Sequence, residues 1–110
     1  MNDGSELDIT RLLNEAAGGN PDALAEIFDR HRDRLYRMIA MRLDPRLRSR
    51  LSPSDILQEA FVDAKRKLPE YLEEPKFSVY FWLRNIASGR LQKTHRFHLD
   101  AQLRDAKRDV

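Results

Sequence analysis

The stretch from residue 52 to residue 68 constrains the fold most, because it carries a helix start and a helical period together. Ser52 can serve as N-cap, Pro53 already has the backbone angle of a first helical residue, and Asp55 can reach back to the Ser52 amide. Six apolar side chains then recur at helical spacing on one face: Ile56, Leu57, Ala60, Phe61, Ala64 and Leu68. The segment is therefore predicted to be an amphipathic helix with a well-defined register.

Polar side chains occupy the other side of this predicted helix. Asp55, Gln58 and Glu59 project together from its first two turns, and Val62 and Asp63 are also expected to point away from the apolar face. A polar outer face on an amphipathic helix is most often solvated surface. Spacing alone favours that interpretation.

Two helices are predicted before this segment. Residues 1–6 are polar and expected to be disordered, and residues 9–16 form a short amphipathic helix. A longer helix is predicted over residues 20–43, with Asn20 as its N-cap. It should end before Pro45, because proline disfavours the helical conformation of the residue before it.

A loop and a final helix are predicted after residue 68. Residues 68–75 contain two prolines and are expected to form the loop, with Tyr71 packed inward. The final helix should begin near Lys76, with Ser78 as its cap, and continue as a basic rod through Arg104. Since no segment shows strand alternation, we predict an all-α fold, a compact bundle of three to four helices.

The charge is segregated along the chain, although the net charge is only +2. Residues 1–29 carry seven acids and one base, and residues 52–75 carry six acids and three bases. Residues 30–51 carry eight bases and two acids, and residues 76–110 carry eight bases and three acids. Two basic blocks are compatible with a polyanionic partner, although charge runs are more often solvated surface.

Composition excludes several classes of protein. The chain has no cysteine, so a disulfide framework, a thiolate metal site and a cysteine nucleophile are excluded. No apolar run reaches the roughly 20 residues that span a bilayer, and the acidic N-terminus does not resemble a signal peptide. With 110 residues, we predict one soluble, cytoplasmic domain with no membrane contact and no cofactor or metal.

Aromatic residues are concentrated at the start of the last predicted helix. Four of the nine in the chain fall within six positions: Phe77, Tyr80, Phe81 and Trp82. Successive helical residues are about 100° apart, so Trp82 and Phe81 cannot share one helix face with Tyr80 and Phe77, and part of the cluster must be exposed or half-exposed. An exposed aromatic beside basic side chains can stack on an unpaired base and hold its phosphates. Core packing remains the alternative for each of them.

Two segments resemble region 2 of bacterial sigma factors, most closely the extracytoplasmic-function group. Residues 55–61, Asp-Ile-Leu-Gln-Glu-Ala-Phe, are similar to the family's Asp-Leu-Val-Gln-Glu-Val-Phe helix. Residues 82–87, Trp-Leu-Arg-Asn-Ile-Ala, are similar to its Trp-Leu-Tyr-Arg-Ile-Ala helix, and residues 68–71, Leu-Pro-Glu-Tyr, to its Leu-Pro-x-Phe loop. The resemblance covers roughly residues 10–96.

The resemblance implies a transcription initiation factor and not an enzyme. It places Asp55, Gln58 and Glu59 against the clamp-helix coiled coil of the largest subunit of core RNA polymerase. Arginine-rich helices would give carboxylates charge-assisted hydrogen bonds, and the Gln58 amide can both donate and accept.

The resemblance also implies that the aromatic helix and its loop capture the melted non-template strand of the minus-ten promoter element. The candidate DNA-binding residues are Tyr80, Phe81, Trp82, Arg84, Arg90, Lys93 and Arg96. An inhibitory anti-sigma protein is a further candidate partner.

Two features depart from the family pattern. Gly89 stands where the family usually has asparagine or another residue, at a cost of about 1 kcal/mol in helix stability. No helix-turn-helix pattern follows, so we expect the chain to be the N-terminal part of a longer protein. We divide it into residues 1–19 as a tail and short helix, 20–99 as the region 2-like domain, and 100–110 as the start of a linker.

Other functional classes remain open. The spacing Arg90-x-x-x-x-His95 occurs in helical ribonucleases of the HEPN type, where His acts as general acid or base and Arg steadies phosphate. His95, His98 and Asp100 form a weak candidate metal site. A helical adaptor that binds a basic helix without DNA is the third alternative.

Overall fold

The structure, a computed structural model, describes residues 3–108, with side chains from residue 8 onward. It contains four α-helices and one short 3-10 turn: α1 (Asp3–Ala17), α2 (Pro21–Arg42), η1 (Pro45–Leu47), α3 (Pro53–Glu73) and α4 (Val79–Arg108). No strand occurs in this range, which confirms the predicted all-α fold. None of these helices combines the length and hydropathy that a bilayer span requires.

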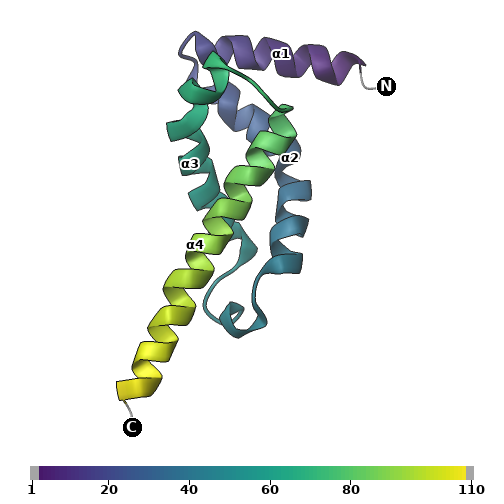
Figure 1. Cartoon of the computed structure of the whole chain (residues 1–110). Coiled ribbons are helices and arrows are strands. Elements are labelled where there is room, and N and C mark those ends of the chain that lie inside the picture. The colour runs from purple at the N-terminus through teal and green to yellow at the C-terminus, as the bar shows by residue number, and fades with distance from the viewer. Residues whose placement is uncertain (1–2, 109–110) are drawn as a thin grey trace.

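Three helices lie alongside one another, and the fourth crosses one end of the group (Figure 1). α2, α3 and α4 pack together, while α1 lies across the end where α3 is joined to α4. The last turns of α4 extend past η1, so the molecule is elongated, with extents of 58 × 27 × 23 Å. α2 and α3 each contact all three other helices, so the bundle is built around this pair.

The core draws on every element of the structure. Its largest fully buried side chains are Leu12, Ile27, Leu35, Ile39, Leu47, Ile56, Leu57 and Leu83. Burial of one such side chain contributes about 1.5–3 kcal/mol. On the predicted apolar face of α3, Ile56, Leu57, Ala60 and Ala64 are buried, and Phe61 and Leu68 pack against them from partly exposed positions. Burial of this face holds α3 against α2 and α4.

The predicted helix caps Ser52, Asn20 and Ser78 are confirmed, although α4 begins at Val79 and not near Lys76. At the start of α3, the Asp55 amide donates to Ser52 Oγ at 3.2 Å and the Ser52 amide donates to Asp55 Oδ2 at 3.0 Å, which completes a capping box. Asn20 caps α2 with its side-chain oxygen. At the start of α4, Ser78 Oγ accepts the Phe81 amide at 3.3 Å. These caps satisfy amides that have no partner within their own helix.

The predicted loop at residues 68–75 is wrong for residues 68–73, because α3 continues past Pro69 to Glu73. A proline inside a helix removes one hydrogen bond and crowds the preceding turn. Tertiary contacts offset this cost. Tyr71 is buried and its hydroxyl donates to the Phe77 carbonyl at 2.6 Å, and Leu72 packs against the core.

The N-terminal segment is also more ordered than its composition suggests. Residues 1–6 are expected to be disordered, but α1 already begins at Asp3, and residues 1 and 2 lie outside the described range. Leu12 is fully buried and anchors the helix. Once a turn is nucleated, propagation towards the N-terminus costs little. Gly19 lies in the connection between α1 and α2. Its φ of 98° falls in the left-handed region that favours glycine.

α4 is a single helix that runs unbroken to Arg108. It therefore includes residues 100–108, and the domain boundary proposed at residue 99 stays a prediction. Gly89 lies in its interior, and a Cβ built there would meet no atom within 4 Å. No close approach of another segment accounts for this glycine.

Candidate functional site

The outer face of α3 carries the three polar residues that the sequence singles out. Asp55, Gln58 and Glu59 are all exposed on its first two turns. The Asp55 carboxylate accepts the Ser52 amide, and a Glu59 oxygen lies 3.6 Å from Arg90 Nη1. We call these three residues the acidic face. It presents two carboxylates and one amide to solvent.

A small hollow borders the acidic face between α2 and α3. It has a volume of about 300 Å³ and is lined by Ala25, Phe28, Asp29, Arg32, Leu57, Gln58 and Phe61. The rings of Phe28 and Phe61 meet edge to face, with their centroids 5.2 Å apart. Gln58 thus lies between a polar surface and an apolar depression. An apolar centre with a polar rim is the usual arrangement of a protein interface.

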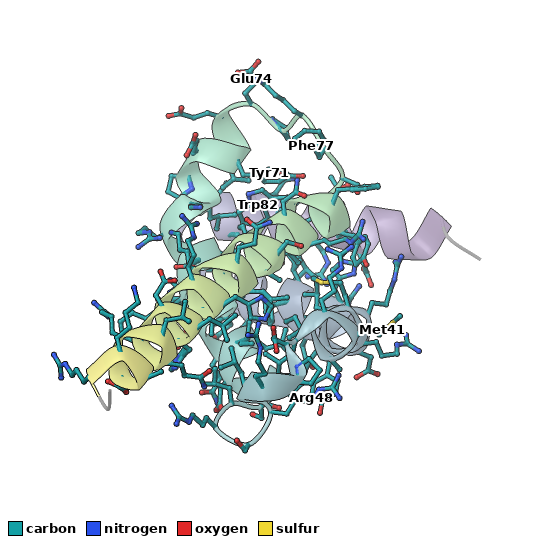
Figure 2. All side chains as sticks on the ribbon, turned by 60° about the horizontal axis from the view of Figure 1, so that its bottom comes forward. Met41, Arg48, Tyr71, Glu74, Phe77 and Trp82 are labelled. Atoms are coloured by element: carbon teal, nitrogen blue, oxygen red, sulfur yellow. The ribbon has the colours of Figure 1, made fainter. Side chains whose placement is uncertain are left out.

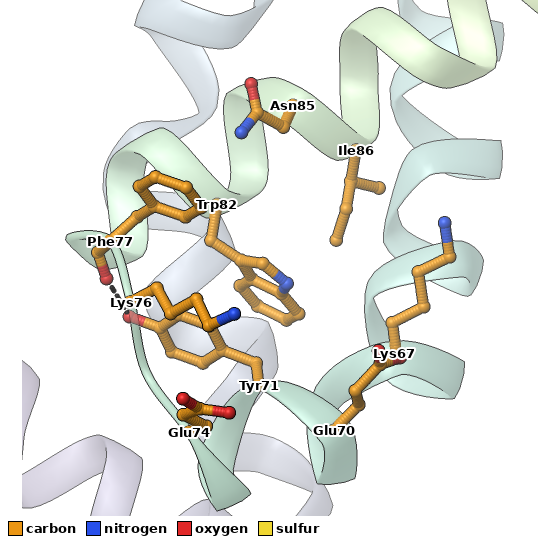
Figure 3. A pocket seen from close by; sticks show the side chains of 9 residues that line it. All are labelled: Lys67, Glu70, Tyr71, Glu74, Lys76, Phe77, Trp82, Asn85 and Ile86. Carbon is orange, nitrogen blue, oxygen red and sulfur yellow. Dashed lines mark hydrogen bonds between the residues drawn. The ribbon is translucent and has the colours of Figure 1, made fainter.

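A larger hollow lies at the other end of α3, where the chain turns into α4 (Figures 2 and 3). Its volume is about 400 Å³, and it is lined by Lys67, Glu70, Tyr71, Glu74, Lys76, Phe77, Trp82, Asn85 and Ile86. We call it the aromatic hollow. The Trp82 indole stacks on the Tyr71 ring at a centroid distance of 4.5 Å and an interplanar angle of 20°. Burial raises the pKa of the Tyr71 phenol, so this group keeps its proton and its bond to the Phe77 carbonyl.

The four clustered aromatic residues separate onto two sides of the chain, but not in the pairs that helical spacing predicts, because Phe77 precedes α4, which begins at Val79. Phe77 and Trp82 line the aromatic hollow. Tyr80 lies on the other side, with the Arg34 guanidinium 3.8 Å above its ring and the His31 ring 5.6 Å away. Phe81 packs its edge on Tyr80 and is 52% exposed. Any stacking surface for bases is therefore divided between two sides of the helix.

The four cationic residues predicted to contact DNA are in different environments. Lys93 and Arg96 are exposed, and Arg84 is half-buried. The guanidinium of Arg90, in contrast, donates two hydrogen bonds to the Asp63 carboxylate, at 2.8 and 2.7 Å. The structure does not bring these four residues into one patch with the aromatic hollow, whose lining contains none of them.

The Asp63 side chain is buried, so the prediction that it points away from the core is wrong. It is only 4% exposed, and it also accepts a hydrogen bond from Arg66 at 3.1 Å. Hydrogen bonds from the Arg90 guanidinium hold the pKa of Asp63 below its ordinary value, in spite of burial, which would raise it. One signal in the sequence was missed, because Asp63 follows Ala60 by three residues and Ile56 by seven, both buried positions of α3.

Further residues of the aromatic hollow were also missed. Lys67, Asn85 and Lys76 line it but were not predicted as site residues. Asn85 follows Trp82 by three residues on α4, so helical spacing could have indicated it. Lys67 and Lys76 come together only because α3 continues past Pro69, which the sequence did not predict.

Neither rival site is assembled as catalysis or metal binding would need. Arg90 is bound to Asp63, while His95 Nε2 accepts the backbone amide of Asp44 at 3.1 Å. Both groups of the Arg-x4-His pair thus pack against neighbouring elements. Within the described residues, no three His, Asp or Glu side chains lie close enough to hold a metal ion.

His31 makes stability depend on pH. Its Nε2 atom is buried without a hydrogen-bond partner. Burial first, and then Arg34 and Arg30, lower the pKa of His31 below its ordinary 6.5. The unfolded chain therefore binds this proton more readily, so the free energy of unfolding should fall as pH drops below about 6.5.

Urea denaturation at pH 7 and pH 5 measures this effect. We expect the wild-type chain to lose stability over this interval and the His31→Phe variant to lose less. The carboxylates with lowered pKa titrate below this interval, since the ordinary value for Asp63 is 3.8. An equal loss in the two proteins would contradict the assignment to His31.

The fold and surfaces together define a class of protein. It is an all-α domain with an acidic helix face at one end of α3 and, at the other, an aromatic hollow lined by two lysines and two glutamates. Residues 27–98 match sigma-70 region 2, which is more than half of the chain, so the chain belongs to this family. No curated protein and no solved structure gives a significant match to the chain.

Membership of this family sets the general function. Sigma-70 region 2 is a domain of transcription initiation factors that binds core RNA polymerase and recognises the minus-ten promoter element. The family is not enzymatic. The acidic face and the aromatic hollow are the candidate surfaces for these two roles.

Proposed function

We propose that the chain is the region 2 domain of an extracytoplasmic-function sigma factor and uses opposite ends of α3 for its two partners. The acidic face binds the clamp-helix coiled coil of the largest subunit of core RNA polymerase. The aromatic hollow receives a base of the melted non-template strand. The observation that carries this proposal is that one helix bears the acidic face on its first turns and lines the aromatic hollow with its last ones.

The chemistry of the aromatic hollow supports a nucleobase as its ligand. Its volume lies within the range of about 300–1,000 Å³ that is usual for small-ligand sites. Phe77 and Trp82 offer ring faces, and the Asn85 amide can donate to and accept from a base edge. Lys67 and Lys76 supply positive charge for the adjoining phosphates, beside the carboxylates of Glu70 and Glu74 in the same lining.

Three cations of α4, two of them exposed and Arg84 half-buried, are proposed to hold the DNA backbone outside the aromatic hollow. Arg84, Lys93 and Arg96 remain candidates for phosphate contacts, and Tyr80 and Phe81 offer a second aromatic surface. Arg90 can serve DNA only if it leaves Asp63. The proposal implies that the chain works in the cytoplasm, where polymerase and promoters meet, and an anti-sigma protein would compete for the same surfaces.

Replacing Gln58 and Glu59 together with alanine tests the polymerase half of the proposal. Affinity for core RNA polymerase should fall by about 1–3 kcal/mol, the usual size for loss of a charged interface hydrogen bond. Both side chains are exposed, so circular dichroism should remain that of the wild type. Fluorescence anisotropy of the labelled chain titrated with core polymerase measures the affinity.

A matched control removes the same two functional groups elsewhere. Gln92 and Asp100 are exposed on α4 and line none of the hollows described here. Their double replacement with alanine should leave polymerase affinity unchanged. Equal affinity of all three proteins would remove the acidic face from the interface.

A further inference from the structure

A third hollow borders the acidic face on the side towards α4. Its volume is about 420 Å³, and it is lined by Leu51, Asp55, Ile56, Glu59, Arg90, Lys93, Thr94, Phe97 and His98. Buried Ile56 and Thr94 are among these residues. Asp55 and Glu59 belong both to this lining and to the acidic face, so the two surfaces are continuous.

Phe97 is the large apolar side chain of this third hollow. It is 67% exposed, and its ring meets the His98 ring edge to face, with centroids 5.2 Å apart and planes 82° apart. A single exposed aromatic is common on protein surfaces. Here the ring borders a depression next to charged groups, so a partner that fills the depression would bury it.

The charges around the third hollow indicate the class of partner. Arg90 is the cation of this lining that lies nearest to Glu59, and its guanidinium is already paired with the Asp63 carboxylate. The lining thus sets two carboxylates on α3, Asp55 and Glu59, opposite one exposed cation on α4, Lys93, so its α3 side opposes DNA phosphates. A protein helix that carries a basic side chain beside an aliphatic one satisfies both the carboxylates and the Phe97 ring.

We propose that the polymerase coiled coil seats an apolar side chain against Phe97 when it docks on the acidic face. α4 then contributes a hydrophobic anchor to an interface whose polar contacts come from α3. The inference rests on the proposed function of the acidic face and adds a residue to it. Aromatic anchors beside charged contacts commonly dominate the affinity of such interfaces.

The test compares Phe97→Ala with Leu103→Ala, both tested in the full 110-residue chain. Leu103 is also exposed on α4, at 62%, and does not line the third hollow. We expect Phe97→Ala to weaken binding to core RNA polymerase about tenfold, as expected for an interface anchor. Leu103→Ala should bind as the wild type does. Thermal melting and affinity for single-stranded DNA should be unchanged in both variants.

The other outcomes are distinguishable. If Phe97→Ala binds polymerase normally while the Gln58/Glu59 double variant binds weakly, the anchor is overturned and the acidic face stands. If Phe97→Ala loses affinity for DNA and keeps it for polymerase, the third hollow serves DNA and the inference is wrong. If neither variant binds polymerase more weakly, the proposed function of the acidic face fails together with the anchor.

Discussion

Replacing Asp63 with alanine will lower the free energy of unfolding by about 3 kcal/mol, because it leaves the Arg90 guanidinium without its two hydrogen bonds in a largely buried position. Asp63 is 4% exposed, and the Arg90 side chain is 26% exposed. The pair joins α3 to α4, so its loss also loosens the two helices that line the aromatic hollow. Urea denaturation followed by circular dichroism measures the change.

Two further variants distinguish the effect of losing the ion pair from the effect of losing a carboxylate alone. Asp33→Ala removes an exposed carboxylate from α2 and should change stability by less than about 0.5 kcal/mol. The double variant Asp63→Leu, Arg90→Met replaces both partners with apolar groups and should regain most of the stability, since such replacements are often neutral. If Asp63→Ala unfolds at the wild-type urea concentration, the pair does not stabilise the fold.

The same pair predicts a response to acid. The pKa of Asp63 is lowered in the folded chain, so the folded state binds this proton less readily than the unfolded state. The stabilisation is therefore complete above the ordinary value of 3.8 and is lost as pH falls through the lower pKa of the folded state. This pH interval lies below the one in which His31 acts. The Asp63→Ala variant should lack this acid-dependent loss of stability.

Local signals in the sequence predicted the elements whose causes are local. Ser52 and Asp55 lie three residues apart and complete their capping box without help from the rest of the chain. The apolar period of α3 likewise depends only on spacing, and four of its six predicted positions are buried. Spacing also predicted that the aromatic cluster divides, but it grouped Phe77 with Tyr80, because it placed Phe77 inside a helix that in fact begins at Val79.

The missed features depend on contacts between distant segments. Pro69 is tolerated inside α3 because Tyr71 packs on Trp82 and donates a hydrogen bond to the Phe77 carbonyl. No local sequence pattern predicts these two contacts. Asp63 could have been placed at a buried position from spacing. Its partner Arg90, 27 residues away, could not have been identified, because pairing depends on how α4 crosses α3. The aromatic hollow forms where the end of α3 meets the start of α4, so no local pattern in the sequence predicts it as a whole.

Replacing Trp82 with alanine should cost both stability and DNA binding. The indole is half-buried against Tyr71, so we expect the free energy of unfolding to fall by about 2–3 kcal/mol, somewhat less than for a fully buried Trp. If the aromatic hollow receives a base, affinity for a single-stranded minus-ten-like oligonucleotide should fall as well, by about 1–3 kcal/mol for one stacked base. Thermal melts and anisotropy titrations on the same protein measure the two losses.

Because Trp82 serves both the core and the aromatic hollow, two exposed phenylalanines decide between them. Phe77 and Phe81 are 56% and 52% exposed, but only Phe77 lines the aromatic hollow. Alanine at either position should leave the melting temperature nearly unchanged. If the base binds in the aromatic hollow, Phe77→Ala weakens binding and Phe81→Ala does not. The reverse result would move the base to the side of Tyr80 and Phe81, and equal losses would mean that the strand crosses both sides of α4.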